Sequence, residues 1–353
     1  MIFGKSPRLV GLDIGSSALK AAELNVTKKG FTLNNFGMTS IVPGAIEEGN
    51  INDPEKVADS IRQLFKANNI KQKKVAISIG GYSVIVKKID VQTASDGEQL
   101  QETIHQEAEQ YIPFDISEVN IDYQILGEKE ADSNQMSVIL VAAKKEMISE
   151  YINLVQMAGL DPCIIDIDAF ALQNIFEVNY DLTDENKNAV LIDIGANKTS
   201  LNILKSHASV FMRDVSMGCS QINQKISSFV DCSFAEAEQF KLGKQADKIS
   251  SDELKQIVSS VISEWSIEIR RALDFYYSAN LDEQIKSIML SGGGAHIKEF
   301  RQLLTTETSS DVEIINPFRK LHIDKHFDPS YLEQIAPQAS ICMGLALRRA
   351  DDK

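Results

Sequence analysis

The sequence lacks any hydrophobic run long enough to cross a membrane. Its longest nearly unbroken apolar run, Val138 to Ala143, is far shorter than the ~20 residues that a membrane-spanning helix needs. The N-terminal stretch MIFGKSPRLVG contains an apolar patch that is too short for the core of a signal peptide. We therefore expect a cytoplasmic protein, and any contact that it makes with a membrane should be through a partner.

Positive charge is scarce as well. Lys and Arg number 36 against 50 Asp and Glu, which gives a formal net charge of −14 at pH 7. Nucleic acid is bound through basic surfaces, so this balance argues against a nucleic-acid-binding protein. It also argues against attraction to anionic lipid through bulk charge, although a local basic patch remains compatible with such binding.

Cysteine is too sparse and too scattered to organise the fold. The four cysteines form no Cys-x-x-Cys pair and have no histidine cluster beside them; they are Cys163, Cys219, Cys232 and Cys342. A disulfide framework is typical of small secreted chains, and a chain of this size does not need one. We therefore expect free thiols in a reducing compartment.

The remaining pattern is that of an ordinary globular α/β protein. The 353 residues are 43% hydrophobic and 24% charged, and this length allows roughly two domains. Runs rich in β-branched residues alternate with helical periodicity, which predicts an α/β architecture. The expected strands are 8–15, 20–25, 31–39, 74–79 and 287–290, and the expected helices are 54–68, much of 220–280, and 338–350.

Residues 82–160 are predicted to form a compact insertion with its own small sheet. The predicted order is β-α-β-β-α, with strands 84–91, 120–126 and 137–144 and helices 97–111 and 145–158. The motif YIPF at 111–114 fits either a binding groove or packing, and we favour packing. The polar segment 179–188 is typical of a hinge before the second half of the chain.

The stretch GLDIGSSALKAAEL near the N-terminus places polar residues on a tight turn between two strands. If the ligand is a nucleotide, Asp13 can order the water shell of Mg²⁺, and Gly15 lets the backbone approach phosphate oxygens. Ser16 and Ser17 offer hydroxyl and N–H donors, and Lys20 on the returning strand can reach the same phosphates. A single copy of this motif is equally typical of a β-hairpin with good turn chemistry.

A second stretch, LIDIGANKTSLNIL, repeats the first at the same register. Asp193 and Gly195 stand where the first copy has Asp13 and Gly15, and Asn197 adds a polar residue to the turn. The lysine and threonine that follow offer further donors. Two copies of one turn, far apart in sequence, indicate two halves that face one ligand.

A third motif, LSGGGAHIKEF, places Gly292, Gly293 and Gly294 between a strand and a helix. Free N–H groups and a partial positive charge at a helix start attract anions, and glycines let a ligand approach closely. Glycines also suit a tight strand-to-helix turn. The motif is informative because it comes third in an ordered series.

In this order, the three motifs resemble those of the actin-like ATPase superfamily, which includes actin, sugar kinases, heat-shock chaperone ATPases and FtsA. Residues 13–20 match its first phosphate motif, 193–199 its second, and 290–297 its adenosine motif. Within the FtsA-like branch, the whole chain is similar to the PilM family of type IV pilus assembly. The likeness is clearest at the N-terminus and in EAEQYIPFDISEVNIDYQILG and IEIRRALDFYYS.

The resemblance implies an α/β fold of two actin-like domains with an SHS2-type insertion in the first. Subdomain IA would comprise 1–81 and 161–187 together with a C-terminal helix at 336–353. The insertion would be 82–160, and domain II would be 188–335 with a helical subdomain at about 220–286.

The resemblance also implies ATP or ADP and Mg²⁺ as cofactors. Asp13 and Asp193 would hold the ion through water, and Lys20 would meet the β-phosphate. The other nucleotide contacts would come from Gly15, Ser16, Ser17, Gly195, Asn197, Gly218, Glu268, Arg271, Gly292, Gly293 and Gly294. For Glu268 and Arg271, an exposed ion pair on a helix face is an equally good explanation.

One departure from the superfamily concerns hydrolysis. Where actin has a glutamine that positions the attacking water, this chain has Asp168. Because that orientation supplies much of the catalysis in phosphoryl transfer, we expect a nucleotide-dependent switch with weak ATPase activity at most. Asp168 is equally suited to cap a helix.

The resemblance implies an adaptor of the pilus machine that supports twitching motility. Such proteins form a homo-oligomeric ring at the inner membrane and bind the N-terminal cytoplasmic tail of PilN, with PilO as an indirect partner and the assembly ATPase as another component.

Three other classes of protein share the fold. An FtsA-like filament protein would carry a C-terminal membrane helix, where this sequence has GLALRRADDK, and a type II secretion relative would carry a transmembrane segment. A small-molecule kinase would need a base beside its substrate, and Asp168 is the only candidate.

Overall fold

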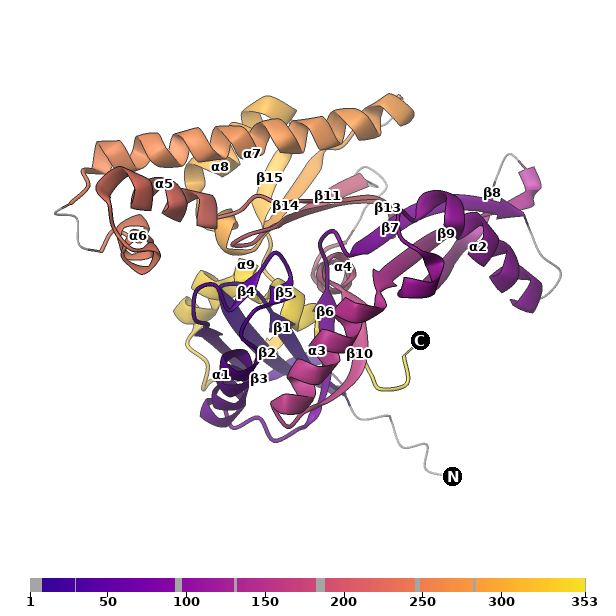
Figure 1. Cartoon of the computed structure of the whole chain (residues 1–353), viewed down its shortest axis with the longest axis horizontal. Helices are drawn as coiled ribbons and strands as arrows, with labels where there is room; N and C mark the ends of the chain where they lie inside the picture. Colours follow the sequence, from indigo (N-terminus) through magenta and orange to yellow (C-terminus); the bar gives the residue numbers. More distant parts are fainter. Residues whose placement is uncertain are drawn as a thin grey trace.

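The computed structural model describes residues 8–28, 30–92, 97–129, 132–181, 188–244, 248–281 and 284–352. Two domains, each built on a sheet, lie one above the other in Figure 1, and a smaller sheet projects to one side. None of the helices within these ranges combines the length and the apolar character that a membrane span requires.

The first domain is built on a six-stranded sheet in the order β10-β6-β1-β2-β3-β16. Its strands are β1 (Val10–Ile14), β2 (Ala18–Thr27), β3 (Gly30–Ser40), β6 (Lys74–Ile79), β10 (Asp161–Ile167) and β16 (His322–Ile323). Successive hairpins join β1, β2 and β3, and β6 and β10 extend the sheet in parallel beside β1. The short strands β4 (Ile46–Glu47) and β5 (Asn50–Ile51) form a separate hairpin.

Helices α1 (Pro54–Ala67) and α3 (Lys145–Met157) share one core with the first sheet. The start of α1 is specified locally, because the Asp53 side chain accepts a hydrogen bond from the Lys56 N–H at 3.2 Å and a proline holds the first helical position. Its apolar residues Ile61 and Leu64 are buried on one face of the helix.

The second domain repeats the topology of the first. Its five-stranded sheet has the order β13-β12-β11-β14-β15. The strands are β11 (Asn188–Ile194), β12 (Thr199–Lys205), β13 (Ala208–Val215), β14 (Ser287–Ser291) and β15 (Asp311–Ile314). Again, three strands form antiparallel hairpins and two extend the sheet in parallel beside the first of them.

Five helical segments belong to the second domain among the described residues. They are α5 (Ser220–Val230), α6 (Phe234–Lys241), α7 (Ser251–Ala279), the short η3 (Gly293–His296) and α8 (Lys298–Thr308). The single tryptophan, Trp265 of α7, is fully buried against the edge of the Phe300 ring. Its indole Nε1 donates a hydrogen bond to Gln221 Oε1 at 2.6 Å, which ties α7 to the start of α5.

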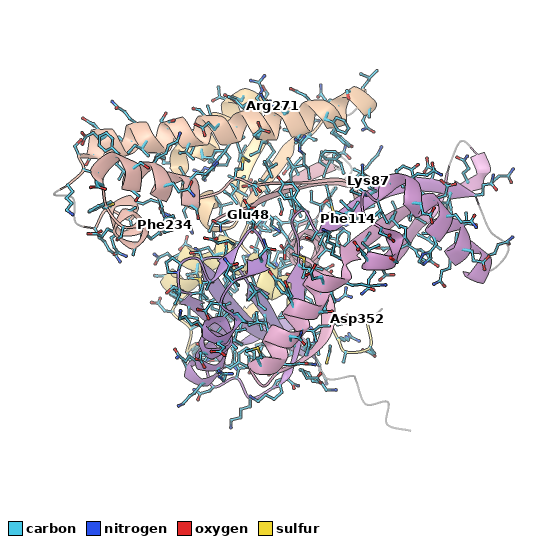
Figure 2. The ribbon with its side chains drawn as sticks, viewed as in Figure 1. Glu48, Lys87, Phe114, Phe234, Arg271 and Asp352 are labelled. Atoms are coloured by element: carbon cyan, nitrogen blue, oxygen red, sulfur yellow. The ribbon has the colours of Figure 1, made fainter. Side chains whose placement is uncertain are left out.

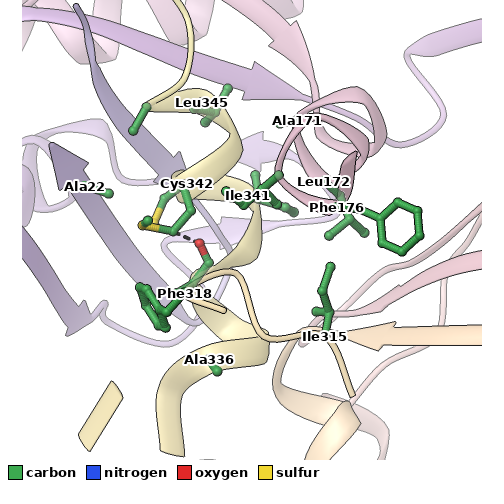
Figure 3. Close-up of a cluster of buried hydrophobic side chains, with 14 of the residues drawn as sticks. Ala22, Ala171, Leu172, Phe176, Ile315, Phe318, Ala336, Ile341, Cys342 and Leu345 are labelled. Atoms are coloured by element: carbon green, nitrogen blue, oxygen red, sulfur yellow. Dashed lines mark hydrogen bonds between the residues drawn. The ribbon is translucent and has the colours of Figure 1, made fainter. Parts of the chain in front are cut away.

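Helices α4 (Asp168–Asn179) and α9 (Pro329–Leu345) pack against each other and connect the two domains. Figure 3 shows Ala171, Leu172 and Phe176 of α4 beside Ile341 and Cys342 of α9. These side chains form one buried cluster with residues of both sheets.

The last helix was predicted at 338–350, and its bounds in the structure are Pro329–Leu345. Asp328 caps the true start, because its side chain accepts a hydrogen bond from Ser330 N at 2.9 Å. Pro337, the residue before the predicted start, lies inside the helix. The prediction was wrong there because tertiary packing retains a proline that usually breaks a helix.

The insertion has a three-stranded sheet in the order β7-β9-β8. Its elements are β7 (Val84–Gln92), α2 (Gly97–Tyr111), the short η1 (Ile116–Glu118), β8 (Val119–Lys129) and β9 (Asp132–Lys144). The YIPF motif packs only in part. Ile112 is buried and Lys144 Nζ lies 4.5 Å from the centre of the Phe114 ring, which is labelled in Figure 2, whereas Tyr111 is 40% exposed and Pro113 is exposed. The helix predicted to complete the insertion, α3, instead packs in the core of the first domain.

Six of the described strands escaped prediction: β4, β5, β10, β13, β15 and β16. The expected strands and helices are present, most of them with shifted ends. The predicted helical stretch 220–280 is divided into α5, α6 and α7. Residues 182–187 of the predicted hinge lie outside the described residues.

Candidate functional site

A cleft of about 1630 Å³ lies between the two domains and is lined from both of them. Residues of all three glycine motifs line it: Asp13, Gly15, Ser16, Ser17, Lys20, Asp193, Gly195, Asn197, Gly292 and Gly293. Asp168 lines it as well. The fold thus brings together segments that are far apart in the sequence.

The first turn joins β1 to β2. Asp13 and Lys20 are directly opposite each other across this hairpin, and Lys20 Nζ lies 2.9 Å from Asp13 Oδ2. The Gly15 N–H closes the turn by donating to the Ala18 carbonyl at 3.2 Å. A Cβ on Gly15 would lie 3.0 Å from that carbonyl oxygen, so glycine suits this close approach.

The second turn, between β11 and β12, has the same geometry. The Gly195 N–H donates to the Lys198 carbonyl at 2.9 Å, at the positions equivalent to Gly15 and Ala18. Ser200 stands opposite Asp193, where the first hairpin has Lys20. The sequence repeat therefore corresponds to a structural repeat, with a different side chain at the lysine position.

Gly218 lies behind the second turn and does not line the cleft. A Cβ there would come 2.5 Å from the Ala196 carbonyl oxygen and 2.6 Å from that of Gly195. The next residue, Cys219, donates its N–H to the Gly195 carbonyl at 3.0 Å. Gly218 thus supports the backbone of the turn.

The glycines of the third motif have different surroundings. Gly292 has φ 80°, and a Cβ on it would lie 2.4 Å from the Ile194 carbonyl oxygen, so it allows β14 to pack against β11. Gly293 lines the cleft, whereas Gly294 packs against the Ile194 side chain and lies outside the lining.

Glu268 and Arg271 do not line the cleft. They form an ion pair with each other one turn apart on α7, and the Arg271 side chain is 66% exposed. Figure 2 labels Arg271 on the long helix that lies farthest from the first domain. The structure therefore favours the exposed-ion-pair explanation for these two residues.

The pKa values of the two hairpin aspartates, Asp13 and Asp193, are both raised. Burial raises the pKa of Asp193 to about 6, against an opposing hydrogen bond with Ser291, and the nearby Asp13 carboxylate raises it further. Burial also raises the pKa of Asp13, although Lys20 opposes that shift. A cation between the two carboxylates would relieve their repulsion.

This donor set fits the Mg²⁺ that the fold family implies. Mg²⁺ prefers hard oxygen ligands and keeps several waters, and Asp13 and Asp193 offer carboxylates on facing turns. Within the described ranges, no three His, Cys, Asp or Glu side chains converge to hold a metal by themselves. The remaining oxygens would come from water and phosphate.

Asp168 is the first residue of α4 and does not cap it, since Ile167 occupies the cap position. Its Oδ1 accepts a hydrogen bond from Ser78 Oγ at 2.6 Å, and its Oδ2 lies 2.5 Å from Lys198 Nζ across the cleft. Burial would raise the pKa of Asp168, but Lys198 and Ser78 outweigh it and the pKa is lowered. Asp168 is therefore a paired carboxylate.

Sequence reasoning missed several polar residues of the cleft. Glu238 and Lys241 of α6 line it, and Glu238 Oε2 accepts hydrogen bonds from Lys241 Nζ at 2.5 Å and from Asn223 Nδ2 at 2.6 Å. Their Glu-x-x-Lys spacing on a helix face was a usable signal. Asp214 of β13 also lines the cleft, and no local pattern marks it.

Residues 11–350 match the family described as type IV pilus assembly protein PilM. The chain belongs to the PilM family. A solved structure described as the PilM-PilN type IV pilus biogenesis complex is 26% identical, with a TM-score of 0.87 over 99% of this chain and 100% of that one.

More distant relatives agree with the fold. The solved structure of MreB5 of Spiroplasma citri bound to AMPPNP is 14% identical, with a TM-score of 0.53 over 98% of this chain and 96% of that one. Cell division protein FtsA of Bacillus subtilis (strain 168) is 24% identical over 275 residues, which are 70% of this chain and 61% of FtsA. The PilM-family chain therefore has the actin-like ATPase fold that its motifs predicted.

Proposed function

We propose that this protein is an ATP-binding adaptor of the type IV pilus assembly machine and that it binds the N-terminal cytoplasmic tail of PilN. The observation that carries the proposal is the likeness, over the whole length of both chains, to a PilM seen in complex with PilN. The three-stranded insertion is the proposed SHS2-type subdomain. An extended tail would gain main-chain hydrogen bonds and side-chain pockets in a groove.

The cleft supports nucleotide binding by this adaptor. Residues of both turns line the same cleft, and Lys20 and Lys198 supply positive charge in it, paired with Asp13 and Asp168. Mg²⁺, when bound, would neutralise phosphate charge. Asp13 and Asp193 would position its water shell, and Lys20 would bind the β-phosphate.

Slow or absent hydrolysis is part of the proposal. Asp168 is shorter than the glutamine of actin, and its Oδ1 is already engaged by Ser78 Oγ, so this side chain is poorly placed to orient the attacking water. The protein then acts as a nucleotide-dependent switch within a ring of copies at the inner membrane.

A pull-down with an immobilised PilN tail from the same organism tests the adaptor role. Wild type, Asp13→Ala and the surface variant Arg271→Ala would each be assayed with Mg-ATP and without nucleotide. We expect tail capture by wild type and by Arg271→Ala, and loss of ATP binding in Asp13→Ala. Capture by none of the three proteins under either condition would contradict the adaptor role.

A further inference from the structure

The strongest unexplained feature of the cleft is an ion pair that joins the two domains. Lys198 Nζ, from the second turn, lies 2.5 Å from Asp168 Oδ2 of the first domain and 3.6 Å from Asp214 Oδ2 of its own domain. The side chain of Lys198 is 27% exposed and lines the cleft, so a ligand there can reach it.

The charges around Lys198 are unbalanced. Burial would lower its pKa, but the carboxylates of Asp168 and Asp214 outweigh burial and raise it, so the amine stays charged. Among the residues that line the cleft, eight carboxylates outnumber five lysines. The lysines on the two hairpins, Lys20 and Lys198, are both paired with aspartates. A polyphosphate entering this excess of negative charge needs every available cation.

The two lysines differ in how they are held. Lys20 lies on a strand and pairs with Asp13 of the same hairpin, so its position is fixed by the turn itself. Lys198 closes its turn directly before β12, and its amine is held by a partner across the cleft. A terminal phosphate carries more negative charge than one carboxylate and would compete for this amine.

We propose that Lys198 distinguishes a nucleoside triphosphate from a diphosphate: it leaves Asp168 to bind the terminal phosphate, which the diphosphate lacks. The inference rests on the proposed nucleotide-binding function and deepens it. Breaking the ion pair removes one direct link between the domains, so the third phosphate is sensed as a change in how they are joined.

The same cluster touches the entry to the insertion. A Cβ on Gly80 would lie 2.3 Å from Lys198 Nζ and 2.5 Å from Asp168 Oδ2, so the backbone after β6 runs directly against the ion pair. The next amide, Gly81 N–H, donates to Asp214 Oδ2 at 2.5 Å. A movement of Lys198 therefore changes the surroundings of the segment that leads into β7.

Calorimetric titration with Mg-ATP and with Mg-ADP tests the proposal on wild type, Lys198→Met, Asp168→Asn and a control. The control is Lys225→Met, which removes an exposed lysine of the same domain that pairs with Glu264 outside the cleft. We expect Lys198→Met to weaken ATP binding roughly 10-fold or more and ADP binding by less than about 2-fold, because only ATP loses a charge-assisted contact.

Two further variants test the competition for the Lys198 amine and the need for its charge. Asp168→Asn should tighten ATP binding several-fold without changing ADP binding, because the competing carboxylate is gone. Lys198→Arg, which keeps the charge, should retain the preference for ATP. Amide hydrogen exchange at Gly81 should respond to ATP more than to ADP in wild type and equally to both in Lys198→Met.

The outcomes separate this inference from the proposed function. If wild type binds both nucleotides and Lys198→Met, folded as judged by its melting temperature, weakens both equally or neither, Lys198 is not the discriminating residue. If wild type binds neither ATP nor ADP, the nucleotide-binding function itself is wrong.

Discussion

Gly344 of α9 lies directly against Ala171 of α4, so close that a Cβ on the glycine would be 1.7 Å from the Ala171 carbonyl oxygen. The two helices that join the domains therefore meet backbone to backbone. At this point no side chain fits between them, because a Cβ on Gly344 would overlap the backbone of Ala171.

Gly344→Ala should destabilise the whole protein. The added methyl group forces the two helices apart in a packed core, and we expect a melting temperature lower by about 5 °C or more in differential scanning calorimetry. Gly293→Ala is the matched control, because its Cβ would meet only the Gln338 side chain at 3.5 Å. Equal melting temperatures for the two variants would contradict the backbone contact.

Gly218→Ala should weaken nucleotide binding through the second turn. Its Cβ would displace the carbonyls of Gly195 and Ala196, and we expect ATP affinity to fall roughly 10-fold in calorimetric titration. Gly37→Ala is the control for a clash of similar closeness, since its Cβ would meet the Asn68 side chain outside the cleft lining. It should lower stability and leave ATP affinity unchanged.

Asp193→Asn should change how stability depends on pH. In the folded protein the pKa of Asp193 is raised to about 6, whereas an unfolded aspartate titrates near 3.9, so the wild-type carboxylate destabilises the nucleotide-free fold above pH 6. The variant should be more stable by about 1 kcal/mol at pH 7, a value kept low because the group faces cleft water.

As the pH falls from 7 to 5, Asp193 gains a proton mainly in the folded state, so this cost shrinks; it disappears only at about pH 4, where the unfolded aspartate is protonated as well. The free energies of unfolding of wild type and variant, measured with urea, should therefore converge. A difference that stays constant between pH 7 and pH 5 would show that Asp193 keeps an ordinary pKa.

Arg271→Ala should leave both the stability of the protein and its ATP affinity nearly unchanged. An exposed ion pair one turn apart on a helix contributes about 0.5 kcal/mol or less, so stability should hardly change. ATP affinity should not change either, because the residue lies outside the cleft lining. A tenfold loss of ATP affinity in calorimetric titration would show that Arg271 contributes to nucleotide binding after all.

The local motifs of the cleft were predictable because each depends on residues that are close in sequence. The turns at Gly15 and Gly195, with an aspartate at the end of each preceding strand, follow from spacing alone. The repeat of one motif then indicated that two halves face each other, and the cleft brings these turns together.

The cluster of Asp168, Lys198 and Asp214 was not predictable in the same way. These residues come from three different elements, and their contacts depend on how the two domains close. The assignment of α3 to the first domain also depends on tertiary packing, since its periodicity shows an apolar face without showing what covers it.

The single tryptophan gives the protein a built-in optical probe. Trp265 is hydrogen-bonded to Gln221, whose neighbour Ser220 lines the cleft, and it lies in the second domain, away from the insertion. Intrinsic fluorescence therefore reports events at the start of α5 without any label. A ligand that binds between the domains would change the tryptophan emission. A peptide that binds to the insertion alone would leave the emission unchanged.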